Sequence, residues 1–381
     1  MIEITQKEKC CGCTACASIC PHQAITMNPD SMGFLYPKVN KNLCTDCGLC
    51  ERVCAFHPNY DISQNLSQPI AYGVRHKKMS EIESSRSGAA FIALSDWILN
   101  QNGVIYGAGY TDHFRVVHKR ATTSAERNEF KGSKYVQSDL TGIFPLIKED
   151  LKNGKIVLFS GTPCQTAGLK SYIPKRLQEN LYLIDIICHG VPSPYIWRDY
   201  LKMIEQKVGK EVIAVDFRNK KDFGWAAHKE TFYFSKKQIT TTAYKDIFFK
   251  HVTIRQACNH CHYANIKRPS DITIGDFWGW QKTDANFNAD DRGCSLVFCN
   301  TEKGREWFQK IQSEINQIPA KIENCLQPNL IKPSSISPLR NKFEKDYIQY
   351  GIEYVTKKYT KISLLQRSKQ KIKRIIKKLL S

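Results

Sequence analysis

Nine of the 16 cysteines lie between Cys10 and Cys54, and this concentration constrains the fold more than any other feature of the 381-residue sequence. In a small secreted domain such a density would indicate a disulfide scaffold. This chain is large, and residues 1–9 contain no apolar segment typical of a signal peptide. We therefore expect a separate module that uses its cysteines for metal binding or redox chemistry.

The cysteines of this module repeat one spacing. The first group reads C-x2-C-x2-C-x3-C-P from Cys10 to Pro21, and the second group repeats the cysteine spacing from Cys44 to Cys54. In two-cluster bacterial ferredoxins, three closely spaced thiolates bind one cubane and the fourth reaches the other cubane. The spacing therefore predicts two [4Fe-4S] clusters, with a first site formed by Cys10, Cys13, Cys16 and Cys54 and a second site formed by Cys44, Cys47, Cys50 and Cys20.

Zinc binding and disulfide bonds are the alternatives for this module. Zinc sites use pairs of C-x2-4-C knuckles, and zinc chemistry does not require the longer spacing twice. Ala55 stands where the second proline of the pattern would be, and Cys11 is surplus to the eight ligands, which favours a packing role for Cys11. We expect residues 1–60 to form an α+β ferredoxin-like domain.

Beyond the module the pattern changes to alternating strands and helices. A polar stretch, residues 61–68, is predicted to be a linker. Strands are predicted at 71–76 and 103–110, with a helix between them, and such β-loop-α-β units indicate an α/β fold. We expect an α/β body with a mixed sheet, divided into regions 69–150 and 151–345.

Two turns in the first of these regions could hold phosphate groups. Residues 84–88 form a loop before a predicted helix, where free backbone N–H groups suit an anion. Residues 131–138 form a basic, hydroxyl-rich turn that could hold a pyrophosphate or a flavin edge. The alternatives are an ordinary helix cap and a solvated turn.

Four later cysteines are candidates for one further site. Cys164 and Cys188 each follow an apolar predicted strand, and Cys258 and Cys261 form a C-x2-C pair. Ligands of open α/β sheets bind at the carboxyl ends of the strands, so these thiols could share one crevice. Four thiolates would suit a third cubane or a structural zinc. The alternative is that the single cysteines are buried small apolar side chains.

Taken together, these blocks resemble the beta subunits of coenzyme F420 hydrogenase and dehydrogenase. The matching blocks are S-G-A at 87–89, G-S-K-Y at 132–135, G-T-P-C-Q at 161–165, C-H-G-V-P-S at 188–193, the pair at 258 and 261, and residues 271–279. With the cysteine module included, the resemblance covers residues 1 to 345.

The resemblance implies an iron-sulfur flavoprotein oxidoreductase. In such a protein FAD exchanges a hydride with a small-molecule substrate and single electrons with iron-sulfur clusters. The resemblance implies a third [4Fe-4S] cluster at a third site, formed by Cys164, Cys188, Cys258 and Cys261. It also implies contacts to the flavin from Ser87, Gly88, Ala89, Ser133, Lys134, Tyr135, Gly161 and Thr162.

The resemblance leaves the substrate and the catalytic residues open. Ala89 replaces the last glycine of the family's Ser-Gly-Gly. His189 and Asp276 are candidates for a general acid. Some members of the family reduce a deazaflavin, some reduce a chlorophyll-type pigment, and many accompany bacterial polysaccharide biosynthesis enzymes.

The formal net charge of +20 is concentrated at one end of the chain. Residues 357–381 contain ten Lys or Arg and no Asp or Glu, which is half of the excess. From Leu365 onward, apolar residues recur with a 3.6-residue period, so the tail 350–381 is predicted to contain a basic amphipathic helix. Such a helix suits an anionic membrane surface or an acidic partner, and docking on the body of the chain is the alternative. Nucleic acid ranks third because no recognised binding module accompanies the charge.

Three kinds of function follow from these features. The first is a flavin and iron-sulfur oxidoreductase, and the second is a non-catalytic electron-transfer subunit that serves a partner enzyme. An iron-sulfur sensor that binds nucleic acid is the third. The first two require an electron donor or acceptor protein. We expect a cytoplasmic protein, peripheral at the inner membrane face if the tail binds lipid, and leave a homo-oligomer open.

Overall fold

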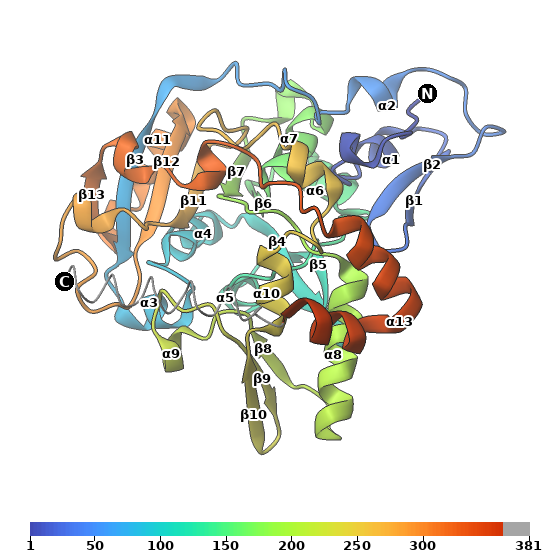
Figure 1. Ribbon diagram of the computed structural model, residues 1–381. Coiled ribbons are helices and arrows are strands. Elements are labelled where there is room, and N and C mark those ends of the chain that lie inside the picture. Colours follow the sequence, from blue (N-terminus) through green and yellow to red (C-terminus); the bar gives the residue numbers. More distant parts are fainter. Residues whose placement is uncertain (361–381) are drawn as a thin grey trace.

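The computed structural model describes residues 1–360, which form an N-terminal module, a body built on an eight-stranded sheet, and a smaller three-stranded sheet (Figure 1). The N-terminal module contains η1 (Lys7–Lys9), α1 (Ala15–Ile19), the antiparallel strands β1 (Ile25–Pro29) and β2 (Leu35–Val39), and α2 (Leu49–Arg52). Its own core is small and consists largely of cysteines and isoleucines. The module therefore folds around its cysteines rather than around a large apolar core.

The body is built on a mixed sheet with the strand order β13-β3-β12-β11-β7-β6-β4-β5. The four central strands β11, β7, β6 and β4 are parallel, and the other neighbours pair antiparallel. The predicted α/β body with a mixed sheet is confirmed. The strands are β3 (Asn65–His76), β4 (Val104–Thr111), β5 (Arg115–Ala121), β6 (Val157–Gly161), β7 (Leu181–Ile186), β11 (Ile272–Asp276), β12 (Ser295–Thr301) and β13 (Ile315–Ala320).

Alternate residues of the central strands pack on opposite faces of the sheet. Val157 and Phe159 pack toward α6 (Ile143–Lys152) and α7 (Pro163–Tyr172), whereas Leu158 packs toward α4 (Ala90–Asn100) and α11 (Glu302–Lys310). Figure 1 shows α6 and α7 between the sheet and the N-terminal module. The core on this face is continuous with apolar residues of the module, such as Phe56. This face of the sheet therefore joins the module to the body.

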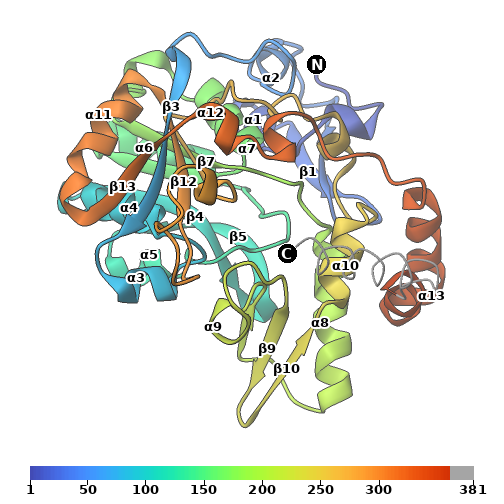
Figure 2. The same ribbon diagram turned by 60° about the vertical axis from the view of Figure 1, so that its left-hand side comes forward.

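The smaller sheet consists of β8 (Ala214–Asp216), β9 (Glu230–Phe234) and β10 (Lys237–Thr241). It projects from the body beside α8 (Pro194–Val208), as Figure 2 shows. Aromatic residues of α8, β9 and α10 (Ala243–Phe249) form a second core with α13 (Arg340–Thr360). The remaining short helices are α3 (Met79–Ser84), η2 (Asp112–Phe114), α5 (Ser124–Asn128), η3 (Lys175–Leu177), α9 (Lys220–Phe223), η4 (Gln256–His260), η5 (Trp280–Lys282), η6 (Gln312–Glu314), α12 (Ile322–Cys325) and η7 (Pro328–Leu330).

The predicted linker at residues 61–68 is partly wrong, because β3 already begins at Asn65. Asn65 pairs with Thr301 of β12, whereas β13 pairs only with the later part of β3, from Ala71 onward. The first residues of β3 thus have a neighbouring strand on one side only. Polar side chains are tolerated there, and they gave this segment the composition of a linker.

The predicted basic tail, residues 350–381, is described only in part. Residues up to Thr360 belong to α13, which has a left-handed break at Gly351, where φ is 75°. The amphipathic period that starts at Leu365 lies outside the described residues, so its membrane or partner role stays a prediction. Among the helices of residues 1–360, none has the length and apolar character needed to cross a bilayer.

Candidate metal centres

The second site lies at the outer end of the module. Its four predicted cysteines, Cys20, Cys44, Cys47 and Cys50, line one cavity, and Cys47 is exposed. The backbone N–H of Ile2 donates to Sγ of Cys50 at 3.3 Å, and that of Ala24 donates to Sγ of Cys20 at 3.4 Å. Hydrogen bonds of this kind stabilise thiolates. A soft four-sulfur donor set with backbone donors fits a cubane at this position.

The first site lies deeper, between the second site and the body. Burial and the neighbouring thiols of Cys13, Cys10 and Cys54 raise the pKa of Cys16. Burial and the thiols of Cys13, Cys10 and Cys50 also raise the pKa of Cys54 to about 11, so Cys54 lies near the cysteines of the first group. Cys54, the last cysteine of the second group, thus joins the first group. The structure brings together the same sets of residues that the spacing pairs.

The third site lies at the carboxyl ends of β6 and β7. Cys164 is the second residue of α7, Cys188 follows β7, and Cys258 and Cys261 come from η4 and the residue after it. All four line one cavity of about 30 Å³. In residues 1–360, no three His, Cys, Asp or Glu side chains are arranged to hold a single metal ion. The four cysteines of the third site instead surround a cavity.

Burial favours the protonated form of two thiols of the third site. Burial raises the pKa of Cys258 to about 11 and that of Cys261 to about 12. The backbone N–H groups of Gly190 and Val191 donate to Sγ of Cys188 at 3.4 Å and of Cys258 at 3.5 Å. Iron binding would have to release these protons. Four sulfurs around one cavity, with backbone donors aimed at two of them, fit a cubane.

Cys11 links the first site to the third. Its thiol lies beside those of Cys13 and Cys164, and it lines the third cavity. Chiefly through the neighbouring Cys11 thiol, the pKa of Cys164 is lowered to about 7. The packing role predicted for Cys11 is therefore incomplete. The only signal in the sequence is its position directly after Cys10, and the contact with Cys164 depends on the tertiary fold.

A buried polar network fixes the start of α7 and therefore Cys164. Gln165 and Thr162 form a capping box, and Nε2 of Gln165 donates to Oγ of Ser138 at 3.0 Å. Nε2 of His118 lies 3.1 Å from the carbonyl oxygen of Ser160 and must donate to it, so Nδ1 accepts from Ser138 at 2.9 Å. Burial lowers the pKa of His118 to about 4, which keeps the ring neutral.

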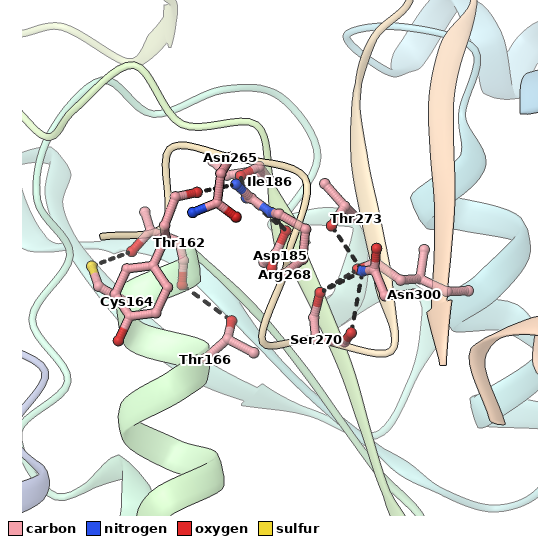
Figure 3. Close-up of polar contacts among 12 residues, drawn as sticks. Thr162, Cys164, Thr166, Asp185, Ile186, Asn265, Arg268, Ser270, Thr273 and Asn300 are labelled. Atoms are coloured by element: carbon pink, nitrogen blue, oxygen red, sulfur yellow. Dashed lines mark hydrogen bonds and ion pairs between the residues drawn. The ribbon is translucent and has the colours of Figure 1, made fainter. Parts of the chain in front are cut away.

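A buried ion pair holds the loop that follows Cys261 (Figure 3). Nη2 and Nε of Arg268 donate to Oδ1 of Asp185 at 2.8 and 3.1 Å, and both side chains are at most 1% exposed. Arg268 also donates to the carbonyl oxygens of Tyr263, at 2.6 Å, and Ile186, at 2.8 Å. Since Asp185 belongs to β7, the pair ties the loop bearing Cys261 to the strand that leads to Cys188.

The candidate flavin residues are not gathered in one place. Thr162 lines the third cavity and Gly161 precedes it. Ser87 donates to the carbonyl oxygen of Cys294 at 2.6 Å, and a Cβ added to Gly88 would lie 2.1 Å from the carbonyl oxygen of Val74. Both residues therefore pack against β3 and β12. Ala89 has a φ of 63°, a left-handed conformation that favours the glycine it replaces.

The candidate basic turn packs against β4 and α10. Nζ of Lys134 lies 5.3 Å from the centroid of the Tyr110 ring and donates to the carbonyl oxygen of Lys131 at 3.1 Å. Burial lowers the pKa of Lys134 to about 8. The ring of Tyr135 lies 5.2 Å from that of Phe248, and Ser133 is half-buried beside these residues.

A cationic group that sequence reasoning missed lies near the end of β11. Nη1 of Arg86 donates to the carbonyl oxygen of Arg218 at 3.0 Å, and Nη1 of Arg218 binds Oδ2 of Asp276 at 2.6 Å. Asp276 is therefore held in an ion pair, which does not suit the predicted role of general acid. Within residues 1–360, Nε of Arg86, Nε1 of Trp225 and Nδ1 of His228 are buried without a hydrogen-bond partner. Buried donors of this kind need an acceptor, and the phosphates of a dinucleotide would supply one.

Two parts of the sequence match known families. Residues 154–321 match the C terminus of the coenzyme F420 hydrogenase/dehydrogenase beta subunit, and residues 9–57 match the 4Fe-4S dicluster domain. The chain thus combines an N-terminal 4Fe-4S dicluster domain with the C-terminal region of a coenzyme F420 hydrogenase/dehydrogenase beta-type subunit. As a beta-type subunit with this domain, it is an iron-sulfur electron-transfer protein of the oxidoreductase class.

A curated relative and a solved structure resemble most of this beta-type subunit. The F subunit of the F(420)H(2) dehydrogenase of Methanosarcina mazei is 21% identical over 324 residues, covering 82% of this chain and 85% of the relative. A chain of the F420-reducing [NiFe] hydrogenase complex from Methanosarcina barkeri is 16% identical, with a TM-score of 0.48, covering 77% of this chain and 92% of that chain.

In this beta-type subunit, aromatic rings connect the third site with the cationic group. His189 lines the third cavity, and its Nε2 lies 2.8 Å from Nε2 of His251. The ring of Phe249 lies 5.1 Å from that of His189 and 5.4 Å from that of His228. His189 is therefore placed between the cysteines and the unpartnered donors of the cationic group.

Proposed function

We propose that this beta-type subunit holds three [4Fe-4S] clusters and one FAD, and passes electrons between a partner protein and the flavin. The observation that carries the proposal is the grouping of the cysteines. Twelve of them fall into three sets of four, each set being gathered in one part of the fold. The clusters would each carry one electron, and FAD would exchange a hydride with a substrate.

The order of the sites supports a path from the surface to the interior. The second site has the exposed Cys47, the first site lies behind it, and Cys11 contacts both Cys13 of the first site and Cys164 of the third. We propose that the electron donor or acceptor protein docks near Cys47. We propose that residues 1–60 form the iron-sulfur module, and that the body consists of the regions 69–150 and 151–345.

The cationic group is the proposed site of the FAD phosphates. Arg86 and Trp225 supply buried donors without partners within residues 1–360, His228 adds a buried ring nitrogen that donates in one tautomer, and the half-buried Lys134 adds a positive charge. Ser87, Gly88 and Ala89 would then act by shaping the start of α4 rather than by side-chain contacts. Phe249 and His189 stand between this position and the third site.

The name of the relative suggests which substrate to test first. The Methanosarcina mazei protein is described as part of an F(420)H(2) dehydrogenase. A reduced deazaflavin is therefore the first two-electron substrate to test with this chain. The association with polysaccharide biosynthesis enzymes stays a prediction.

Anaerobic purification with iron, sulfide and flavin analysis tests the proposal. We expect about twelve irons and twelve sulfides per chain, together with bound FAD. Cys188→Ser should remove about four irons, whereas Cys299→Ser, at a buried position in β12, should retain them. Fewer than about eight irons in the wild type, or bound zinc, would contradict the proposal.

The flavin requires a separate measurement. Arg86→Met should lower the FAD content while the iron content stays at the wild-type value. The exposed Lys221, close by in α9, provides a matched control, since Lys221→Met should change neither content. Turnover of a reduced deazaflavin by the chain alone, compared with turnover in the presence of a redox partner, distinguishes a complete enzyme from one that depends on other proteins.

A further inference from the structure

Arg255 is a buried cation at the junction between the N-terminal module and the body. It directly precedes η4, which carries Cys258, and its side chain reaches into the module. Nε donates to the carbonyl oxygen of Cys10 at 2.7 Å, and Nη2 donates to that of Leu35 at 2.9 Å. Nη2 also lies 3.5 Å from Sγ of Cys10, and the residue is 1% exposed. Arg255 also lines the third cavity, so the residue borders two proposed cluster sites.

The charge of Arg255 has no carboxylate partner within residues 1–360. Its Nη1 donates to the neutral Oε1 of Gln137 at 3.0 Å, and its guanidinium carbon lies 4.2 Å from the centroid of the Tyr36 ring. By contrast, the buried Arg268 is neutralised by Asp185. A buried cation without an anionic partner is strongly unfavourable. The anionic groups available to Arg255 are the thiolates of the neighbouring sites.

The surroundings hold the guanidinium in one position. Gly12 has a φ of +73°, and a Cβ added there would lie 2.7 Å from Nη1 of Arg255. Nε2 of Gln137 donates to the carbonyl oxygen of Cys11 at 2.9 Å, so Gln137 bridges Arg255 and the module. The module and the body thus share a rigid contact around a single positive charge.

We infer that Arg255 is a fixed charge that raises the reduction potentials at the first and third sites relative to the second site. This inference rests on the proposed clusters. Each one-electron reduction adds negative charge at a site, and a nearby buried cation stabilises the reduced form. Arg255 is not among the residues that line the second site. Transfer of an electron from the exposed second site to the first and third sites would therefore be energetically favourable.

Four variants at two positions separate the charge from the packing. Arg255→Gln removes the charge, and Arg255→Lys keeps it with fewer hydrogen bonds. Gln137→Glu leaves the guanidinium in place and adds a carboxylate 3.0 Å from it, so its charge is neutralised without its removal. Gln137→Met is the matched control, because it removes the bond to the Cys11 carbonyl oxygen and adds no charge.

The readout is an anaerobic potentiometric titration of the full chain, monitored by electron paramagnetic resonance, with iron content measured on each variant. Arg255→Gln and Gln137→Glu should make reduction at the first and third sites at least tenfold less favourable, which is about 59 mV for a one-electron couple. The second site serves as the internal reference. The reduction potentials of Arg255→Lys and Gln137→Met should stay close to those of the wild type.

Two outcomes overturn the inference. One is an iron-loaded Arg255→Gln protein with unchanged potentials. The other is a shift in the potentials of Arg255→Lys or Gln137→Met that equals the shift in Arg255→Gln, since the effect would then come from packing. If Arg255→Gln does not assemble, the comparison of Gln137→Glu with Gln137→Met decides. A wild type that lacks the clusters would instead refute the proposed function, which the iron analysis shows separately.

Discussion

Gly168 of α7 lies directly against Cys13 of the N-terminal module. A Cβ added at Gly168 would be 2.7 Å from Sγ of Cys13 and 2.8 Å from its Cβ. Gly168 is one helical turn after Cys164, so a single helix contacts the first site with one turn and carries a proposed ligand of the third site on another. The absence of a side chain at Gly168 therefore allows the two sites to approach each other.

Gly168→Ala should disturb the first site without removing a ligand. The added methyl group would have to displace Cys13, and overpacking of this kind costs about 1–3 kcal/mol. We expect lower iron content and a less stable fold in anaerobic denaturant titration. Ser171→Ala, at an exposed position of the same helix, is the matched control and should behave as the wild type. Unchanged iron content and stability in Gly168→Ala would show that the module is not seated on α7 as described.

Local sequence patterns were sufficient for the α/β body and for the two cysteine groups of the module, whereas the third group was left open by the patterns and was implied by the resemblance. The ligand spacing of the module is a short-range signal, and apolar strands ending before Cys164 and Cys188 placed both residues at one edge of the sheet. The start of β3 was misjudged because a strand paired on one side tolerates polar side chains.

Long-range contacts could not be predicted in the same way. Arg255 bonds to Cys10, which is 245 positions away, and Arg86 bonds to Arg218, 132 positions away. Nothing in the sequence around these arginines indicates such partners, because the parallel sheet brings the segments together only after folding. Asp276 was predicted as a general acid from its aromatic neighbours, but the fold pairs it with Arg218.

Asp185→Asn should be strongly destabilising. The substitution would leave the guanidinium of Arg268 buried without a counter-charge, and breaking such a pair typically costs about 3–5 kcal/mol. The surface pair of Lys175 with Asp61, whose side chains are 68% and 40% exposed, is the control. Lys175→Ala should cost no more than about 1 kcal/mol. Free energies of unfolding from anaerobic denaturant titration measure both values, and equal losses would contradict the assignment of Asp185 and Arg268 as a structural pair.

His118 should make the fold sensitive to acid. Burial lowers the pKa of His118 from its ordinary value of 6.5 to about 4, so the unfolded chain binds a proton that the folded chain excludes between these two values. Stability contributed by the neutral ring is therefore present above pH 6.5 and is lost as the pH falls toward 4, by about 3 kcal/mol in total. His118→Gln removes this term. The difference in unfolding free energy between pH 7 and pH 4.5 should be smaller in the variant, and equal differences would exclude His118 as a cause.

Cys11→Ala tests whether the three ligand sets are complete without the thirteenth cysteine. Cys11 lines the third cavity and lies beside Cys13 and Cys164, so its position alone would also suit a ligand. The proposed ligand sets nevertheless place four other cysteines at each of the two sites that Cys11 touches, and a cubane takes four. We therefore expect Cys11→Ala to keep about twelve irons per chain. Only the reduction potentials at the first and third sites should change. Cys258→Ala, which removes a proposed ligand from the same cavity, should lose about four irons. If Cys11→Ala loses as much iron as Cys258→Ala, the assignment of the third site is wrong and Cys11 belongs to its ligands.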